Sequence, residues 1–282
     1  MQGNTQGRPP AIFDEGPLRT REARAARRRA RGESFLLARI ADDIADRLLD
    51  VNRSFERMLL VAPVGFAQLL LSRLPAERHP ALTEARPSEH TRLEAPPASF
   101  DLVVAILGLG LANDPVGSLI EARTRLVPDG LLLAAFLGGE TLSELRSALY
   151  ALDTDALGSP APRIHPAISH VEAGQLLARA GLALPVVDFD RFTVAYRDLA
   201  TLVADLRDAG LTNTLAARGG PLPRDTLARL SGMLRDADGK HPTTFEILYL
   251  TAWAPHESQQ KPLKPGSAQV SLGEVLKRPS PS

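Results

Sequence analysis

Uninterrupted apolar runs alternate with helix-forming segments through the first half of the chain. The runs, which are typical of parallel strands buried on both faces, occupy residues 57–62, 99–108 and 131–137. Segments with helical spacing or helix-capping residues follow them at 66–74, 114–126 and 142–151. Strands that alternate with helices predict right-handed crossovers and a parallel sheet, so the expected fold class is α/β.

The second half is predicted to complete this sheet. Apolar residues alternate at 243–253, where Phe245, Ile247 and Tyr249 share one face. This last strand is expected to run antiparallel to its neighbours, and another strand is predicted at 186–196. A proline-rich loop is predicted at 152–170. The remaining helices are predicted at 171–180, 198–209 and 223–235.

Two earlier segments limit the size of the sheet. Residues 35–51 form an amphipathic helix, which should pack on the body of the domain. Residues 75–97 are polar and rich in proline, and only Ala81-Leu82-Thr83-Glu84 could form a short strand. A full α/β repeat needs more chain than this. The sheet is therefore expected to be abridged between its second and third strands.

The chain is expected to hold one α/β domain, at residues 32–254, between two flanking segments. Residues 1–31 are predicted to be a disordered, basic N-terminal arm, and residues 255–282 an extended polar tail. From Arg19 to Arg31 the arm contains seven arginines among alanines. This pattern is typical of a solvated helical face, and it leaves docking to an acidic partner, to RNA or to a membrane surface open.

Composition excludes several classes of site. The absence of cysteine rules out disulfides, thiolate nucleophiles and thiolate metal ligands, and fits a cytosolic protein. The 33 basic and 33 acidic residues cancel, so no nucleic-acid partner is expected. No apolar run approaches the ~20 residues of a membrane span, and no signal core follows the N-terminus, so a cytoplasmic location is expected. No metal motif, P-loop or Ser/His/Asp pattern is present, and no metal is predicted.

The turn after the first predicted strand, Ala62-Pro63-Val64-Gly65, lacks the usual features of a nucleotide site. Such turns normally carry several glycines, which let the backbone approach a ligand and direct N–H groups toward it. This turn has one glycine, and its proline has no N–H group. The sequence therefore predicts weakened cofactor binding at this turn.

Several motifs resemble one family of proteins. They are Ile12-Phe13-Asp14, Ile44-Ala45-Asp46-Arg47, Phe100-Asp101-Leu102-Val103-Val104, Asn113-Asp114, Val127-Pro128-Asp129-Gly130, Phe136 to Arg146, Thr243-Thr244-Phe245-Glu246-Ile247 and the tail from His256 to Glu274. With these motifs the chain resembles the class I S-adenosylmethionine (SAM)-dependent methyltransferases, and among them the methyltransferase-like assembly factors of respiratory complex I. It is similar, less closely, to the malonyl-carrier-protein methyltransferases. The resemblance is weakest at residues 57–97.

The resemblance implies a methyltransferase-like domain with SAM as its cofactor. In the family an acid and three glycines surround the methionine part of SAM, and a second acid binds the ribose. Here Leu60 stands at the position of the first acid, and Glu84 is the candidate for the second. The positions that the resemblance assigns to the cofactor are Ala62, Pro63, Gly65, Glu84, Leu107 and Gly108.

The same resemblance places Gly138, Gly139, Glu140 and His165 on the substrate or partner side. From the residues alone, the 138–141 segment is as well explained by a tight strand-to-helix turn with Glu140 near a helix N-terminus. A surface or capping role is the simpler interpretation of His165. Both interpretations are kept as alternatives.

The complex I assembly factors hydroxylate an arginine in an iron–sulfur subunit of NADH dehydrogenase. The resemblance therefore implies a protein substrate, such as a subunit of that enzyme. Two alternatives stay open, which are SAM-dependent methyl transfer at an unusual site and a catalytically inactive fold kept as a binding platform. Peripheral membrane contact through the arm from Arg19 to Arg31 is a further expectation.

Overall fold

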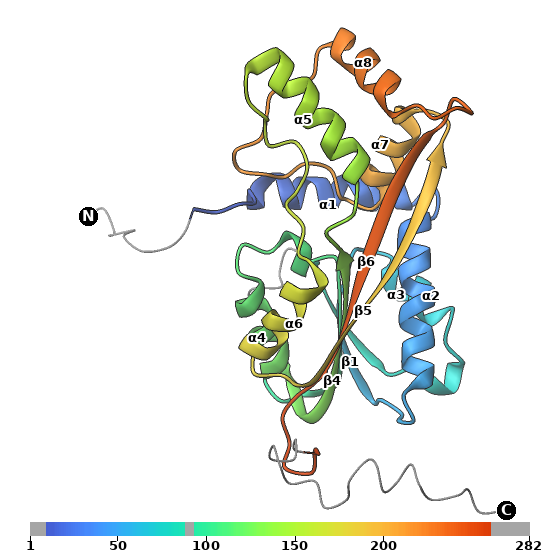
Figure 1. Cartoon of the computed structure of the whole chain (residues 1–282). Coiled ribbons are helices and arrows are strands. Elements are labelled where there is room, and N and C mark those ends of the chain that lie inside the picture. The colour runs from blue at the N-terminus through green and yellow to red at the C-terminus, as the bar shows by residue number, and fades with distance from the viewer. Residues whose placement is uncertain (1–9, 88–92, 261–282) are drawn as a thin grey trace, which may run out of the picture.

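A single mixed sheet forms the centre of the molecule (Figure 1). The computed structural model describes residues 10–87 and 93–260. Strands in that part of the chain pair in the order β2-β1-β3-β4-β6-β5. β1 to β4 run parallel, and β6 runs antiparallel to both β4 and β5. The bounds are β1 Arg57–Val61, β2 Ala81–Ala85, β3 Phe100–Ile106, β4 Leu126–Leu137, β5 Ala183–Tyr196 and β6 His241–Trp253.

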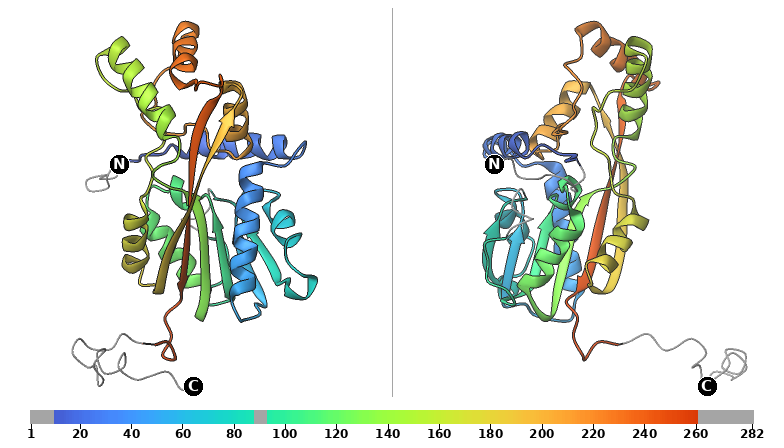
Figure 2. Two further views of the ribbon diagram at one scale, coloured as in Figure 1. Left: turned by 45° about the vertical axis from the view of Figure 1, so that its right-hand side comes forward. Right: turned by 90° about the vertical axis from the view of Figure 1, so that its left-hand side faces the viewer.

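Helices cover both faces of this sheet. α2 and α3 lie on one face, and α4 and α6 lie on the other (Figures 1 and 2). The bounds are α1 Glu15–Arg29, α2 Phe35–Asp50, α3 Phe66–Leu71, α4 Pro115–Arg125, α5 Ser143–Leu157, α6 His170–Arg179, α7 Leu199–Asp208 and α8 Arg224–Leu234.

Alternate residues of the central strands build two separate cores. Leu60 and Val104 belong to the core that includes α2 and α3, whereas Leu59 and Val103 belong to the core that includes α4 and α6. All four side chains are at most 1% exposed. Burial on both faces explains why these strands are continuous apolar runs in the sequence.

The topology confirms the expected α/β class and the antiparallel last strand. It also confirms the abridged region, because β2 is the only strand that the described residues form between β1 and β3. β2 pairs with β1 and forms an edge of the sheet. The short strand predicted at 81–84 is therefore the only strand that the described residues place outside β1 at this edge of the sheet.

Two elements are longer than predicted. β4 begins at Leu126, because Phe100 of β3 pairs with Leu126 before a register shift and the parallel ladder then resumes. α5 continues to Leu157, because Leu149 and Leu152 pack against Leu230 of α8. The predicted proline-rich loop therefore starts only after this helix ends.

Part of the segment at 1–31 that is predicted to be a disordered, basic arm forms a helix in the residues that the structure describes. α1 begins at Glu15, with the Asp14 side chain as its N-cap. Leu18 and Ala25 are buried on one side of α1, which packs against α7. These two apolar positions are seven residues apart, so they share one helical face and give an otherwise basic helix a docking stripe.

β5 and β6 extend beyond the carboxyl ends of the parallel strands as a two-stranded ribbon (Figure 1). β6 pairs with β4 only from Ile247 onward, and its earlier residues pair with β5 alone. α5, α7 and α8 lie around this extension, and α1 crosses near its base (Figure 2). None of the helices in the described ranges is long and apolar enough to cross a membrane.

Candidate functional site

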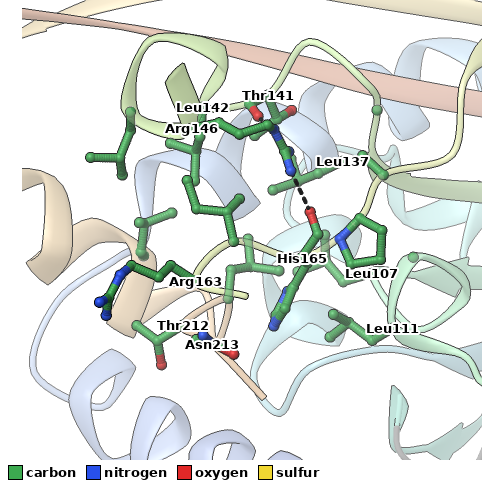
Figure 3. Close-up of a pocket in the computed structure, with 18 of the residues that line it drawn as sticks. Leu107, Leu111, Leu137, Thr141, Leu142, Arg146, Arg163, His165, Thr212 and Asn213 are labelled. Carbon is green, nitrogen blue, oxygen red and sulfur yellow. Dashed lines mark hydrogen bonds between the residues drawn. The ribbon is translucent and has the colours of Figure 1, made fainter. Parts of the chain in front are cut away.

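A pocket lies where the carboxyl ends of β3 and β4 meet the start of α5 (Figure 3). Leu107 and Leu137 line it from the two strand ends, and Leu142 and Leu149 line it from the start and the middle of α5. The loops at 163–167 and 211–213 close it. Its volume is about 170 Å³. Open parallel sheets bind ligands at this edge, so the pocket is the candidate functional site.

Arg163 is one of two arginines that line this pocket, and its charge is compensated. Its guanidinium donates to both carboxylate oxygens of Asp153, at 2.6 and 2.7 Å, and to the carbonyl oxygen of Gly220 at 2.8 Å. The hydrogen bond from Arg163 is the main reason that the pKa of Asp153 lies below its ordinary value. Since Asp153 is buried, this pair serves to hold the loop after α5 in place.

His165 is a neutral, half-buried wall of the pocket. Its Nε2 accepts a hydrogen bond from the Thr214 backbone N–H at 2.8 Å, so Nδ1 carries the proton. The ring of Phe13 packs edge-on against it, with centroids 5.3 Å apart. Burial, and then the charges of Arg21 and Arg146, lower its pKa from 6.5 to about 4. His165 is thus half-buried and bonded to the backbone at Thr214, and both the surface or capping role and the substrate-side role stay predictions.

Arg146 carries the other charge of the pocket. It donates to the carbonyl oxygen of His165 at 3.1 Å and to that of Thr141 at 3.5 Å (Figure 3). In the portion of the chain that the structure describes, no carboxylate forms an ion pair with Arg146. Backbone carbonyls orient this guanidinium but do not neutralise it, so the pocket holds a net positive charge.

Two leucines that line the pocket adopt a left-handed backbone conformation. Leu107 has φ 65° at the end of β3, and Leu142 has φ 59° immediately before α5. Non-glycine residues seldom adopt this region, and such strain is frequent at binding sites. The Leu142 backbone N–H bonds to the Thr244 carbonyl oxygen at 2.8 Å, so pairing with β6 holds one of the two in place.

The turn after β4, residues 138–141, is fixed to β6 through Glu246. The Gly138 N–H donates to the Glu246 carbonyl oxygen at 2.8 Å, and Thr141 Oγ1 both donates to that oxygen and accepts from the Glu246 N–H. A Cβ on Gly138 would overlap Glu246 Oε1, so only glycine fits there. Gly139 has open space around it, and Glu140 is exposed. A tight strand-to-helix turn bonded to β6 thus explains why residues 138 and 141 are glycine and threonine.

The turn after β1, residues 62–65, has part of its backbone bonded to other segments. The Ala62 N–H donates to the Ala85 carbonyl oxygen of β2 at 3.0 Å, and Pro63 has no N–H. The Val64 carbonyl oxygen accepts from Arg29 Nε of α1 at 3.2 Å. Gly65 adopts φ 90° as the N-cap residue immediately before α3. None of these residues lines the pocket at the ends of β3 and β4.

These residues do not fit the SAM molecule that the family resemblance implies. The acid position holds Leu60, which is buried in the core, and Ala62 and Pro63 provide no free N–H. Above the end of β3, a Cβ on Gly108 would lie 3.1 Å from the Pro87 carbonyl oxygen, so the chain itself occupies that space. No reaction step through SAM is therefore derived.

The predicted site residues fall into two groups. Leu107, Gly138 and His165 meet at the pocket. The others, which do not line it, are Ala62, Pro63, Gly65, Glu84, Gly108, Gly139 and Glu140. Glu84 is exposed near the end of β2, in register with Leu60. The cofactor positions inferred from the resemblance thus stay a prediction, and only part of the substrate-side set meets in one place.

Comparison with known proteins reveals the family of this chain. No family model matches it. A human protein named arginine-hydroxylase NDUFAF5, mitochondrial, is 34% identical over 98% of this chain and 86% of its own length. The chain belongs to the methyltransferase-like NDUFAF5 family. The zebrafish (Danio rerio) protein of the same name is 32% identical over 86% of this chain and 82% of its own length.

The NDUFAF5 family is also related to a methyltransferase of known type. A malonyl-[acyl-carrier protein] O-methyltransferase of Laribacter hongkongensis is 34% identical over 79% of this chain and 70% of its own length. Among solved structures, a putative methyltransferase of Bacillus halodurans matches with a TM-score of 0.48 and 10% identity, over 75% of this chain and 99% of that one. The mostly parallel sheet with an antiparallel β6 is a class I methyltransferase-like fold.

Motifs that resemble the NDUFAF5 family meet one another in the structure. Phe13 and Asn113 are joined by two hydrogen bonds. The Phe13 N–H donates to Asn113 Oδ1 at 2.9 Å, and Asn113 Nδ2 donates to the Phe13 carbonyl oxygen at 3.0 Å. Gln259 of the tail donates to Asp129 Oδ1 at 2.9 Å. The rest of the tail motif, from residue 261 onward, lies outside the described residues. The shared motifs thus tie distant parts of the chain together.

Sequence reasoning missed three residues that shape these sites. Glu246 could have been recognised from the sequence, because it is a carboxylate on an otherwise apolar face of the last strand. Arg146 ended a motif that the resemblance had already marked. Arg29 left no signal of its own among seven similar arginines, since only the tertiary structure places it against Val64.

Proposed function

We propose that this protein is an assembly factor of respiratory NADH dehydrogenase that acts on a protein substrate. The observation that carries the proposal is the 34% identity to an arginine-hydroxylase NDUFAF5 along 98% of the chain. The contacts between the shared motifs support it, since Phe13 bonds to Asn113 and Gln259 bonds to Asp129. The modified side chain is then an arginine of that substrate, as the name of the relatives suggests.

SAM-dependent methyl transfer is the less favoured chemistry. The turn after β1 lacks the acid that holds SAM in the family, and two of its residues, Ala62 and Pro63, provide no free N–H group. Losing one charge-assisted hydrogen bond weakens binding by roughly tenfold or more. Calorimetric titration should therefore give no heat of binding at about 1 mM SAM, and micromolar binding would reverse this ranking.

A catalytically inactive binding platform is the second candidate function. It is favoured by Arg29 and Pro87, which occupy space at the two strand ends where a cofactor would approach. The pocket also lacks a carboxylate, and Nε2 of His165 already accepts a hydrogen bond. A platform needs only its partner-facing surfaces, so it would tolerate this arrangement.

A deletion strain separates these proposals. Native gels should show loss of assembled NADH dehydrogenase, and expression of this chain from a plasmid should restore it. Mass spectrometry of the assembled enzyme should then find an arginine heavier by one oxygen atom if the factor is a hydroxylase. Restored assembly without that modification would support the platform. Normal assembly in the deletion strain would contradict a role in assembly.

We also propose a cytoplasmic location with peripheral contact to an anionic membrane surface through α1. Arg21, Arg24, Arg27, Arg28 and Arg207 line a second cavity of about 350 Å³. Arg28 pairs with Asp208 and Arg21 with Thr212. The others form no ion pair with any carboxylate in the described ranges. A surface of this charge attracts anionic lipid headgroups.

Vesicle co-sedimentation tests this contact. The protein should bind vesicles of phosphatidylglycerol and phosphatidylcholine, and the binding should fall as salt is raised. Replacing Arg24 and Arg27 by glutamine should weaken binding by roughly thirtyfold, since each arginine contributes about 1 kcal/mol near such a surface. The matched double replacement of Arg179 and Arg235, two exposed arginines elsewhere, should have little effect. Equal binding to uncharged vesicles would contradict the proposal.

A further inference from the structure

The pocket at the ends of β3 and β4 carries one cation that the protein does not neutralise. Arg146 and Arg163 are the two arginines that line it, and Arg163 is bound to Asp153 on both carboxylate oxygens. No aspartate or glutamate is among the described residues that line the pocket. Arg146 contacts only backbone carbonyl oxygens in the bonds described above, so its charge has no counterion among residues 10–87 and 93–260.

Nearby groups strengthen this positive field. His165 is held neutral, because burial and the charges of Arg21 and Arg146 lower its pKa to about 4. Arg21 approaches from α1 and donates to Thr212 Oγ1, at the edge of the pocket, with 2.5 Å between the two atoms. A positive field inside apolar walls is less screened than one at the surface. The pocket therefore favours an anion.

The walls and the volume limit what this anion can be. Aliphatic side chains form most of the lining, among them Leu111, Leu145 and Leu211. The volume of about 170 Å³ is close to the ~150 Å³ cavity that holds benzene, so it suits a ligand of about six to eight non-hydrogen atoms. Such walls favour a carboxylate on a short hydrocarbon chain over inorganic phosphate.

We propose that this pocket binds a small organic acid, with its carboxylate on Arg146 and its hydrocarbon chain among the leucines. The planar guanidinium matches a carboxylate in geometry, and the ligand supplies the missing counterion. An arginine side chain does not suit this pocket, because its guanidinium would face Arg146 with no carboxylate between them.

This inference goes beyond the proposed role in assembly and does not depend on the protein substrate. If the assembly factor modifies an arginine, the acid occupies a separate position beside that reaction. If it is a binding platform, the acid is a bound ligand. Binding of the acid to the purified protein is measured without NADH dehydrogenase, so failure of one proposal is distinguishable from failure of the other.

Calorimetric titration of the purified full chain with acetate, butyrate, hexanoate and octanoate tests the proposal. Affinity should rise with chain length to butyrate or hexanoate and not increase further at octanoate, because the volume of about 170 Å³ is filled by about eight non-hydrogen atoms. Hexanamide, which has the same shape without the charge, should bind at least about tenfold more weakly. Equal binding of the amide and the acid, or affinity that rises steadily through octanoate, would overturn the proposal.

Two pocket variants and one control variant sharpen the test. Arg146→Gln should weaken hexanoate binding by about tenfold or more, whereas Arg179→Gln, at an exposed arginine outside the pocket, should leave it unchanged. If Arg146→Gln does not fold, the comparison of acid with amide on the unmodified protein decides. Leu211→Phe should shift the optimum to a shorter acid. Free arginine that competes with hexanoate for the pocket would also overturn the proposal.

Discussion

Two turns at the same edge of the sheet, after β1 and after β4, differ in their bonding partners and in whether they line the pocket. The turn after β4 is bonded to β6 through Glu246, and its Gly138 lines an open pocket. The turn after β1 is bonded to β2 and to α1, and none of its residues lines that pocket. Both follow a buried parallel strand and precede a helix, so their position in the fold does not explain the difference.

The difference lies in which side chains approach each turn. At 138–141 a glycine leaves room for one buried carboxylate, and the backbone groups bond to a neighbouring strand. At 62–65 an alanine and a proline face the core, and an arginine from 35 residues earlier in the chain reaches the turn. The ligand-binding edge of this NDUFAF5-family chain thus has an apolar pocket on the β4 side, whereas on the β1 side Val64 and Gly65 line a separate cavity of about 540 Å³ together with Arg29.

The largest expected effect follows from adding one methyl group to the β4 turn. Gly138→Ala would place a Cβ against Glu246 Oε1 and 2.8 Å from Leu248 Cγ, so the turn must move from β6. We expect a loss of about 3 kcal/mol in the free energy of unfolding, measured by urea denaturation. Gly139→Ala is the matched control, because nothing lies within 4 Å of its Cβ. Equal losses in both variants would show that the turn is not held by Glu246.

A smaller effect is expected from acid, through His165. Its pKa in the folded state is about 4, below its ordinary value of 6.5, so the unfolded chain binds more protons between these values. Stability should therefore fall as the pH is lowered, by about 2 kcal/mol from this residue between about pH 7.5 and pH 5.

The His165→Gln variant isolates this contribution. Its stability should depend less on pH over that range than the stability of the unmodified protein, as followed by thermal unfolding at several pH values. If stability depended on pH equally in the two proteins, His165 would not be shielded from solvent. The inference that this residue stays neutral beside the pocket on the β4 side would then fail.

The smallest effect is expected at the β1 turn. Arg29→Gln removes the bonds from Arg29 to the carbonyl oxygens of Val64 and Asp208, and should lower stability by about 1 kcal/mol. Arg27→Gln, at an exposed arginine of the same helix, should change stability by less than about 0.5 kcal/mol. The comparison of the two turns would need revision if Arg29→Gln conferred SAM binding, which a titration detects.

Much of the fold could be predicted because its signals are local. Continuous apolar runs identified β1, β3 and β4, and alternation identified β6 and its direction. The parallel arrangement of β1, β3 and β4 followed from the alternation of strands and helices. The ends of α5 and β4 were less accurate, because distant partners such as Leu230 decide where they stop.

The site was predicted only in part, because its deciding contacts are long-range. His165 was recognised as a candidate on the substrate side, but its burial depends on Phe13 and Thr214, which are far from it in the chain. Ala62 and Pro63 could be seen to lack cofactor-binding groups. The neighbours that fill the space, Arg29 and Pro87, could not be inferred from residue type or spacing.

The docking of α1 on α7 has a consequence for synthesis of the chain. Arg21 bonds to Thr212, and the Asp14 backbone N–H bonds to the carbonyl oxygen of Thr214, so residues made first contact residues made some 190 to 200 positions later. These contacts can form only when most of the chain has left the ribosome. The arginine-rich helix therefore stays exposed during translation, and the pocket that it supports is among the last parts of the molecule to be completed.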